Sequence, residues 1–518
     1  MKMPVDDLMK RVKKAWGVKG QWDNLYNDAY SLALPNRNTF YEQTAGQDKN
    51  TVVYDSTLQQ STVKLASTLQ STIVPPFTEW ATLIPGPFLT QGLEEAKRKL
   101  QSINKAVFAA INISNFDTAV GEYFLDLTIG TAAMLILEGD DEIPFKFITV
   151  PLSEIALEEG ADSGVGAIFR KYKKPARVIP QMWKDGKKCP ELDKIIREDG
   201  GIDILLNELT YLDPDTKKWN YSIIIEKIEG GNQPIEYVSR TYTTNPWVIS
   251  RWIKVAGETF GRGPVINALP DAKTLNTAKK LELQNASLAV SGVWLARNNG
   301  VLNGNNIRIR PGSVIPVQST GGAMGADIVP LQVGGDINYS QIVQDQLRQS
   351  IKDAMFDRSI PDQGAVRSAT EWIVRQQELQ EAIGAPFGRM YQEFIVPMYR
   401  RILDILKKKG IVEDIKINGG VVQVQITGSL AQAQNLKEVE TLTNWAQTSM
   451  AITGPEVFQA TAKVEDICGK LAALMGIDPN MVRSDMEKQQ MAQQAMQMAQ
   501  QGGEGGGQPM GGGGQGQS

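Results

Sequence analysis

The chain has 518 residues, of which 42% are hydrophobic and 22% charged, an ordinary balance for a globular protein with buried cores. This length predicts about three domains. The net charge is −4 and the pI about 5.4. These values argue against a protein whose main role is to grip nucleic-acid phosphates, because such proteins carry a basic excess.

The chain has only two cysteines, Cys189 and Cys468, and they lie far apart in the sequence. They cannot form a disulfide framework or a zinc motif, so we expect a reducing compartment. No apolar run approaches the ~18–20 residues of a membrane span, and residues 1–7 do not resemble a signal peptide. We therefore expect no membrane partner.

Histidine is absent from the whole chain. Its absence excludes serine hydrolase triads, Cys–His proteases, HExxH metalloproteases and most zinc sites. The sequence also lacks a GxxxxGK[ST] phosphate loop, and no GxGxxG precedes a helix in a βαβ unit. We expect no catalytic residue, no metal site and no cofactor.

The opening third is predicted to be mostly helical. Residues 1–20 are locally basic and indicate a loose first helix, for which a solvated face is the commoner use and contact with nucleic acid or an acidic partner the alternative. An aromatic and apolar stripe from Trp22 to Ala33 follows at helical spacing and stops at Pro35. Further helices are expected at 56–74, 91–112 and 115–136.

After Leu137 the pattern changes to short β-rich runs separated by Gly, Asn, Asp and Pro, which indicate antiparallel strands at 145–150, 167–172, 202–211, 219–228, 235–243 and 248–255. A basic run lies among them, comprising Arg170, Lys171, Lys173, Lys174, Arg177, Lys184, Lys187 and Lys188. We interpret it as a solvated strand edge bearing lysines, with DNA or an acidic partner as the alternative.

Two helices then flank a glycine-rich stretch. Apolar spacing predicts a helix over 264–292, with Pro264 suited to its first turn, and another over 336–357. Between them, residues 293–335 show strand signals at 307–309 and 314–317 and predict a small β-insert.

A loop at 358–368 follows, and Ser368 with Glu371 forms a capping box that starts a long helix over 369–410. Gly384 and Pro386 interrupt this helix, so we expect a kink near Ala385. The two helical arms beside the loop would span roughly 30 Å and 60 Å, which is too long for a small compact domain. We therefore expect the two arms to present the loop to a binding target.

The C-terminal part is predicted to contain strands within 411–430, near 421–426, and helices from 430 to 475. A capping box at Ser484 and Glu487 begins a Gln/Met/Ala-rich helix that reaches about Gln500 and suits packing against copies of itself. Residues 501–518 are mostly Gly and Gln and are expected to be disordered.

In this order the elements resemble the portal (head-to-tail connector) proteins of tailed bacteriophages, most of all the short-tailed, podovirus type. No single piece is specific, but the pieces follow one another over almost the whole chain. They are Trp22 with Asp28-Ala-Tyr30, Leu34-Pro-Asn-Arg37, Val53-Tyr-Asp-Ser-Thr57, Leu65-Ala-Ser67, Pro75-Pro76, Trp80, Arg251-Trp252, Gly257-Glu258, Gly261-Arg262, Gly476-Ile-Asp-Pro479 and the stretch from Glu487 to Met498.

The resemblance implies an α+β, mainly helical portal fold, assembled as a ring with a central channel and generally twelve copies. It assigns 1–263 with 411–430 to the wing, 264–292 and 336–357 to two stem helices, 293–335 to the clip, 358–368 to the tunnel loop, 369–410 to the long kinked helix of the wing, 431–500 to the crown and 501–518 to the tail. No extended barrel is expected beyond the crown.

The same resemblance implies a structural protein at one capsid vertex of the virion, made in the host cytoplasm. It would serve as the conduit for DNA packaging and ejection and as the platform for motor and tail attachment. The implied partners are further copies of the chain, double-stranded DNA passing non-specifically, the major capsid and scaffolding proteins, the terminase packaging motor, which would carry the ATP hydrolysis, and a tail adaptor.

The residues expected to face DNA are those of the tunnel loop: Arg358, Ser359, Asp362, Gln363 and Arg367. A channel through which DNA slides should not hold phosphates tightly, so we expect Arg358 or Arg367 to approach them only transiently. Pairing of these arginines with Asp357 and Asp362 is an equally weighted alternative.

Two other function classes remain open. A ring-forming tail-adaptor or secretion scaffold would not need the β-insert between two stem-like helices. A hydrolase built on paired carboxylates is a further alternative, but the carboxylates are numerous and unpatterned, so none is nominated.

Overall fold

The computed structural model describes residues 3–40, 46–86, 93–140, 142–161, 164–226, 233–291, 294–297, 314–317, 328–330, 337–357, 384, 386–413, 422–426 and 429–475. Helices and mostly antiparallel sheets occur in separate groups, and among the described strands only β12 and β13 pair in parallel, so the fold is α+β, as predicted. The chain divides into two compact units, Met1–Ile426 and Thr427–Ser518, which are considered separately below. None of the described helices is long and apolar enough to cross a membrane.

The first helix, α1 (Val5–Ala33), is continuous over 29 residues and joins the two helical segments that the sequence predicted. Its buried side chains recur every three to four residues and include Leu8, Val12 and Tyr26. The 3₁₀ turn η1 (Pro35–Arg37) follows, since a proline disfavours helical geometry in the residue before it.

Three more helices follow in the first unit, α2 (Thr57–Ile73), α3 (Leu93–Asn112) and α4 (Phe116–Ile129). The predictions for the first two are confirmed, but the predicted extension of the third to residue 136 is wrong. α4 ends at Ile129, and the next residue is Gly130, where a β-carbon would lie 2.2 Å from the carbonyl oxygen of Gly261. Beyond it, Thr131–Glu138 is the strand β2, and its nearly continuous burial leaves no alternation by which the sequence could distinguish strand from helix.

β2 is the middle strand of a three-stranded antiparallel sheet, between β3 (Phe145–Val150) and β9 (Trp247–Arg251). Two short ladders accompany it in this unit. They are β1 (Ala81–Pro85) with β15 (Val422–Ile426) and β10 (Ile253–Lys254) with β11 (Gly261–Arg262).

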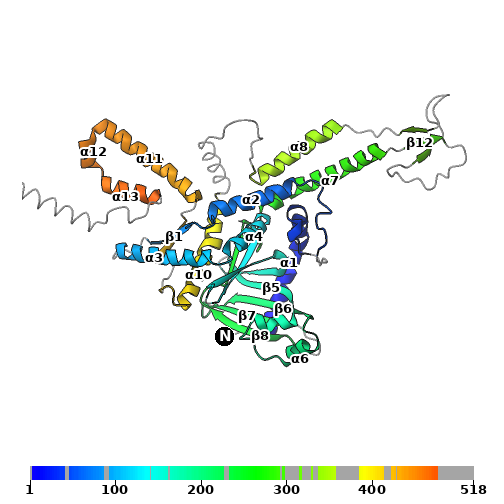
Figure 1. Ribbon diagram of the computed structural model, residues 1–518, viewed down its shortest axis with the longest axis horizontal. Coiled ribbons are helices and arrows are strands. Elements are labelled where there is room, and N and C mark those ends of the chain that lie inside the picture. The colour runs from blue at the N-terminus through cyan, green and yellow to red at the C-terminus, as the bar shows by residue number, and fades with distance from the viewer. Residues whose placement is uncertain are drawn as a thin grey trace, which may run out of the picture. The chain divides into compact units, whose positions relative to one another are not determined.

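A second sheet has five antiparallel strands in sequence order. They are β4 (Ile155–Glu159), β5 (Val165–Pro175), β6 (Asp203–Leu212), β7 (Trp219–Ile225) and β8 (Ile235–Tyr242). Side chains of the N-terminal half of α1 pack on one face, around Phe169 and Leu209. The other face carries a core that includes α6 (Pro190–Asp199), and Figure 1 shows both helices beside the sheet. The short turns η2 (Leu152–Glu154), η3 (Ala176–Val178) and α5 (Ile179–Met182) connect these elements.

The strand that carries the start of the basic run is not an edge, so that interpretation is wrong. β5 pairs with β4 on one side and β6 on the other. Arg170 binds Glu154 at 2.9 Å and Glu208 at 3.4 Å, and Lys171 binds Glu226 at 3.1 Å. Because the sequence pattern missed β4, the interior position of β5 was not foreseen.

The helices predicted on either side of the β-insert are confirmed as α7 (Pro264–Ser291) and α8 (Ile337–Ala354). Between them the described strands are β12 (Trp294–Arg297), β13 (Val314–Val317) and β14 (Ile328–Pro330), in the order β13-β12-β14. The strand predicted at 314–317 is therefore confirmed, while the one at 307–309 falls outside the described residues.

Within the predicted long helix, residues 386–390 are helical, Tyr391–Ile395 forms the π-helical turn η5, and α10 (Val396–Lys408) completes it. The π turn was not predicted. Its signal is Pro397, which has no N–H to donate to the carbonyl of Glu393 and so disfavours a regular α-helical ladder there.

α10 is anchored in the aromatic core of the first unit. Trp80, which is 2% exposed, stacks on Phe116 at 5.9 Å between ring centroids and meets the ring of Tyr399 edge-on at 5.7 Å. Edge-to-face and offset contacts of this kind add about 0.5–1.5 kcal/mol each beyond burial. The long helix is thereby fixed against α3 and α4.

The second unit is helical where it is described, as predicted. It contains α11 (Ser429–Thr453), α12 (Pro455–Thr461) and α13 (Val464–Leu474). The rings of Trp445 and Phe458 lie 5.8 Å apart, and Lys470 pairs with Glu438 at 2.6 Å. The predicted helix from Ser484 to Gln500 and the tail at 501–518 lie outside the described residues.

Candidate functional site: the α7–α8 hairpin and its attachment to α2

α7 and α8 form an antiparallel hairpin (Figure 1). The Oγ of Ser350 donates to Asp271 Oδ2 at 2.6 Å, and the Nε2 of Gln344 donates to Glu282 Oε2 at 2.9 Å. The later residue of α7, Glu282, pairs with the earlier residue of α8, Gln344, so the two helices run in opposite directions. The hairpin is therefore held by neutral donors on α8 and carboxylates on α7.

The charges of this hairpin are close to balanced within its described residues. Its basic side chains are Lys273, Lys279, Lys280, Arg348 and Lys352, and its acidic ones are Asp271, Glu282, Asp345 and Asp353. Lys279 pairs with Glu282 at 3.1 Å, and Lys273 reaches Asp28 of α1 at 2.5 Å. Cations already engaged by carboxylates attract phosphates weakly, because an incoming phosphate must displace the partner.

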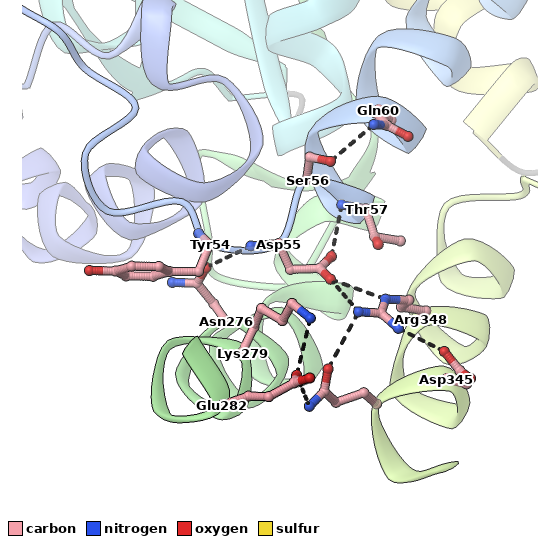
Figure 2. A network of polar contacts seen from close by, with 11 residues as sticks. Tyr54, Asp55, Ser56, Thr57, Gln60, Asn276, Lys279, Glu282, Asp345 and Arg348 are labelled. Carbon is pink, nitrogen blue, oxygen red and sulfur yellow. Dashed lines mark hydrogen bonds and ion pairs between the residues drawn. The ribbon is translucent and has the colours of Figure 1, made fainter. Parts of the chain in front are cut away.

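The segment that leads into α2 is attached to α7 by one amide side chain. Asn276 Oδ1 accepts the backbone N–H groups of Tyr54 at 2.7 Å and Asp55 at 3.3 Å, and its Nδ2 donates to the carbonyl of Val52 at 2.8 Å. Figure 2 shows this contact on one side of the network. The amide satisfies backbone groups that would otherwise need a neighbouring strand or water.

Asp55 connects the start of α2 to α8 (Figure 2). One oxygen accepts the backbone N–H of Thr57 at 3.0 Å, and the other accepts Arg348 Nε at 3.0 Å and Nη2 at 2.9 Å. Burial acts to raise the pKa of Asp55, but the hydrogen bonds from Thr57 and the charge of Arg348 outweigh it, and the pKa is lowered. The carboxylate is thus held in its charged form as a bridge between two helices.

The C-terminal end of α8 is a Schellman motif without glycine. The N–H of Phe356 binds the carbonyl of Asp353 at 3.1 Å, and the N–H of Asp357 binds that of Lys352 at 2.8 Å. Phe356 has φ of 57°, a left-handed conformation that costs a non-glycine residue about 1–2 kcal/mol. Its ring lies 6.2 Å from that of Trp252, a contact that offsets part of this cost.

Asp357 attaches this end of α8 to α2. Its Oδ2 accepts the hydroxyl of Ser61 at 3.2 Å, and its Oδ1 accepts Lys64 Nζ at 2.5 Å. The aspartate side chain is 9% exposed and that of the lysine 52%. Two separate contacts therefore join α2 to α8, one through Asp55 and one through Asp357.

The tunnel-loop residues predicted from the sequence, Arg358, Ser359, Asp362, Gln363 and Arg367, all lie outside the described residues. Gly384 and Pro386 are helical, but the kink predicted near Ala385 falls on a residue that is not described. Asp357, the predicted alternative partner of the loop arginines, is bound by Ser61 and Lys64.

Sequence reasoning missed the roles of Asp55, Asn276 and Arg348. A local signal existed for the first, since an aspartate two residues before a helix start is typical of capping. The partners on α7 and α8 carried no such signal, because each lies more than 200 residues away. Among the described residues, no group of three or more Cys, Asp or Glu side chains could hold a metal ion.

Residues 5–482 match the model of the family described as bacteriophage head to tail connecting protein. The chain belongs to this family. Membership in the connecting-protein family agrees with the prediction of a structural, non-catalytic role. It also confirms the resemblance drawn from residues dispersed between Trp22 and Met498.

Three curated relatives of this connecting protein are 20% identical to it. The portal protein of Enterobacteria phage T3 aligns over 504 residues, 92% of this chain and 90% of the relative. The portal protein of Escherichia phage T7 aligns over 423 residues, 78% and 74% respectively. The probable portal protein of Bordetella phage BPP-1 aligns over 529 residues, 94% and 92%.

Solved structures give more distant matches. A chain from the virion of the native gene transfer agent particle has a TM-score of 0.35 at 10% identity and covers 85% of this chain and 96% of its own length. A chain from the neck of the native particle, computed with C12 symmetry, has a TM-score of 0.33 at 9% identity, with coverages of 82% and 92%.

Proposed function

We propose that this connecting protein is a portal: a ring of twelve copies at one capsid vertex, through whose central channel double-stranded DNA is packaged and ejected. The family assignment over residues 5–482 and the portal names of the curated relatives support this. The observation that carries the proposal is the α7–α8 hairpin with strands β12, β13 and β14 between its two helices.

The proposed regions follow the sequence analysis. The wing comprises 1–263 with 411–430 and receives the long helix 369–410. The stem is formed by 264–292 and 336–357, the clip by 293–335, and the tunnel loop by 358–368. The crown is formed by 431–500, followed by the tail at 501–518.

The charge balance of the stem suits transit of DNA. Each phosphate contact adds affinity and increases salt dependence, so a channel lined by free cations would retain DNA. The hairpin instead engages Lys273, Lys279 and Arg348 with carboxylates. A wall with this pattern lets phosphates pass without binding them for long.

The proposed partners follow from this role. The clip meets the terminase motor, which supplies ATP hydrolysis, and later the tail adaptor, while the wing contacts capsid and scaffolding proteins. The protein is made in the host cytoplasm and resides at the portal vertex of the virion. The alternative of another ring-forming scaffold, such as a tail adaptor or a secretion ring, is not favoured, because every observation that fits it fits the portal as well.

Charge reversal in the proposed tunnel loop tests this function. We expect Arg367→Glu to lower the DNA content of assembled particles, because it adds a repulsive charge to each subunit where DNA passes. Lys194→Glu, in an exposed pair with Glu198 on α6, is the matched control and should package normally. Normal packaging and retention in both variants would contradict a DNA-facing role of the loop.

A further inference from the structure

α2 and α8 lie in parallel and are joined at two points with the same spacing. Asp55 and Lys64 are nine positions apart beside α2, and their partners Arg348 and Asp357 are also nine positions apart beside α8. At 1.5 Å per helical residue, each pair of points is separated by about 13 Å. The two helices therefore meet at matched positions.

The polarity of the two ion pairs is reversed. At the first point the acid, Asp55, lies beside α2 and the base, Arg348, on α8; at the second the base, Lys64, lies on α2 and the acid, Asp357, follows α8. A hydrogen-bonded ion pair requires N···O distances near 3 Å. A slide of α8 by one helical turn, about 5.4 Å, would break both pairs together.

We propose that Asp55, Lys64, Arg348 and Asp357 are positioning residues that lock α8 in one axial register along α2. Asp357 is the residue immediately before 358–368, so this lock sets the point from which that loop starts. The consequence for DNA transit rests on the proposed portal function. The register lock itself does not, because all four residues belong to one chain.

The exposure of the four side chains supports this assignment. Asp55 and Asp357 are each 9% exposed, whereas Arg348 and Lys64 are 29% and 52% exposed. Each carboxylate also accepts a hydrogen bond from a second, neutral donor on α2. Asp55 accepts the backbone N–H of Thr57, and Asp357 accepts the hydroxyl of Ser61. A carboxylate removed from water and held from two sides has a narrow range of positions, which a surface ion pair lacks.

A distance measurement in the full-length protein tests the lock. Spin labels at Ser67 of α2 and Gln346 of α8, both exposed, lie far apart along the helix axes and report a slide directly. The exposed Cys468 is first replaced by serine so that only the two engineered cysteines react, and labelled chains are diluted with unlabelled ones. We expect one narrow distance distribution for the otherwise unchanged chain.

The variants are chosen to break and restore one pair. Lys64→Glu places two carboxylates together and should broaden the distribution or shift it by up to about 5 Å, one helical turn. The double variant Lys64→Glu with Asp357→Lys should return the narrow distribution, because it restores a pair of opposite charges at the same two positions. The hydroxyl of Ser61 can still take part, since it can either donate to a carboxylate or accept from an ammonium group. Arg348→Ala should broaden it independently, and the exposed control Lys194→Glu should leave it unchanged.

Circular dichroism of each variant establishes that it is folded. An unchanged distribution in folded Lys64→Glu and Arg348→Ala would overturn the register lock, as would failure of the double variant to restore the distance. These outcomes are separate from the portal function. A protein that forms no rings but shows the predicted distance changes would refute the portal and retain the lock.

Discussion

Replacing Glu393 by alanine should strongly destabilise the first unit, because it removes the counter-charge of a buried arginine. Glu393 lies in the π-helical turn η5 and binds Arg251 of β9 through three contacts: the backbone N–H at 2.9 Å, Nε at 3.3 Å and Nη2 at 2.6 Å. The side chain of Arg251 is 3% exposed and that of Glu393 18%. The pair joins the long helix to the three-stranded sheet.

Removing one partner of a buried ion pair costs about 3–5 kcal/mol, since the remaining charge stays desolvated. The lower end applies here, because Arg251 Nη1 also donates to the carbonyl of Thr259 at 3.4 Å. We expect about 3 kcal/mol for Glu393→Ala. Glu393→Gln keeps one acceptor oxygen but loses the charge, and about 1.5 kcal/mol is expected for it.

Urea denaturation followed by circular dichroism measures these free energies. The control is Glu413→Ala, whose carboxylate is 71% exposed and pairs with Lys99 at the surface, so we expect a loss below about 0.5 kcal/mol. A loss for Glu393→Ala no larger than that of the control would refute the argument that this pair fixes the long helix.

The three remaining predictions concern two glycines, Gly263 and Gly17, and the buried Lys19. A β-carbon at Gly263 would lie 2.1 Å from the carbonyl oxygen of Thr128, so Gly263→Ala should lower stability by about 2 kcal/mol or more in denaturation experiments; Gly17→Ala, with open space in α1, should raise it by about 0.5–1 kcal/mol. Burial lowers the pKa of Lys19 from 10.5 to about 8. Between pH 8 and pH 10.5 the Lys19 side chain is protonated in the unfolded chain and neutral in the folded chain. The free energy of unfolding, measured relative to the Lys19→Met variant, should therefore rise with pH across this range, by up to about 3 kcal/mol. A flat difference between the two proteins from pH 8 to pH 10.5 would contradict this assignment.

The long amphipathic helices were predictable because local spacing determines them. α2, α7 and α8 carry apolar residues at helical intervals between clear breaks, and their predicted bounds differ from the observed ones by a few residues. β2 was missed for a physical reason. The strand lies between β3 and β9 and packs against α4, and its side chains are buried on both faces of the sheet, so neither helical nor strand periodicity is visible.

The contacts of the candidate site could not be predicted in the same way. Asp55 binds Arg348, which lies 293 positions away in the sequence, and the backbone N–H of Tyr54 binds Asn276, which lies 222 positions away. Such pairs depend on how α2, α7 and α8 pack, and a single sequence does not encode that packing in any local pattern. The segment Val53–Thr57 was one of the pieces on which the family resemblance rested, but its structural role became apparent only from these contacts.

The subunit count of the purified protein tests the portal proposal most directly. Native mass spectrometry should give a species of about 683 kDa, twelve times the chain mass of 56.9 kDa, and electron micrographs of the same sample should show rings with a central hole. A monodisperse species of 56.9 kDa without rings, at the concentrations used for assembly, would contradict it.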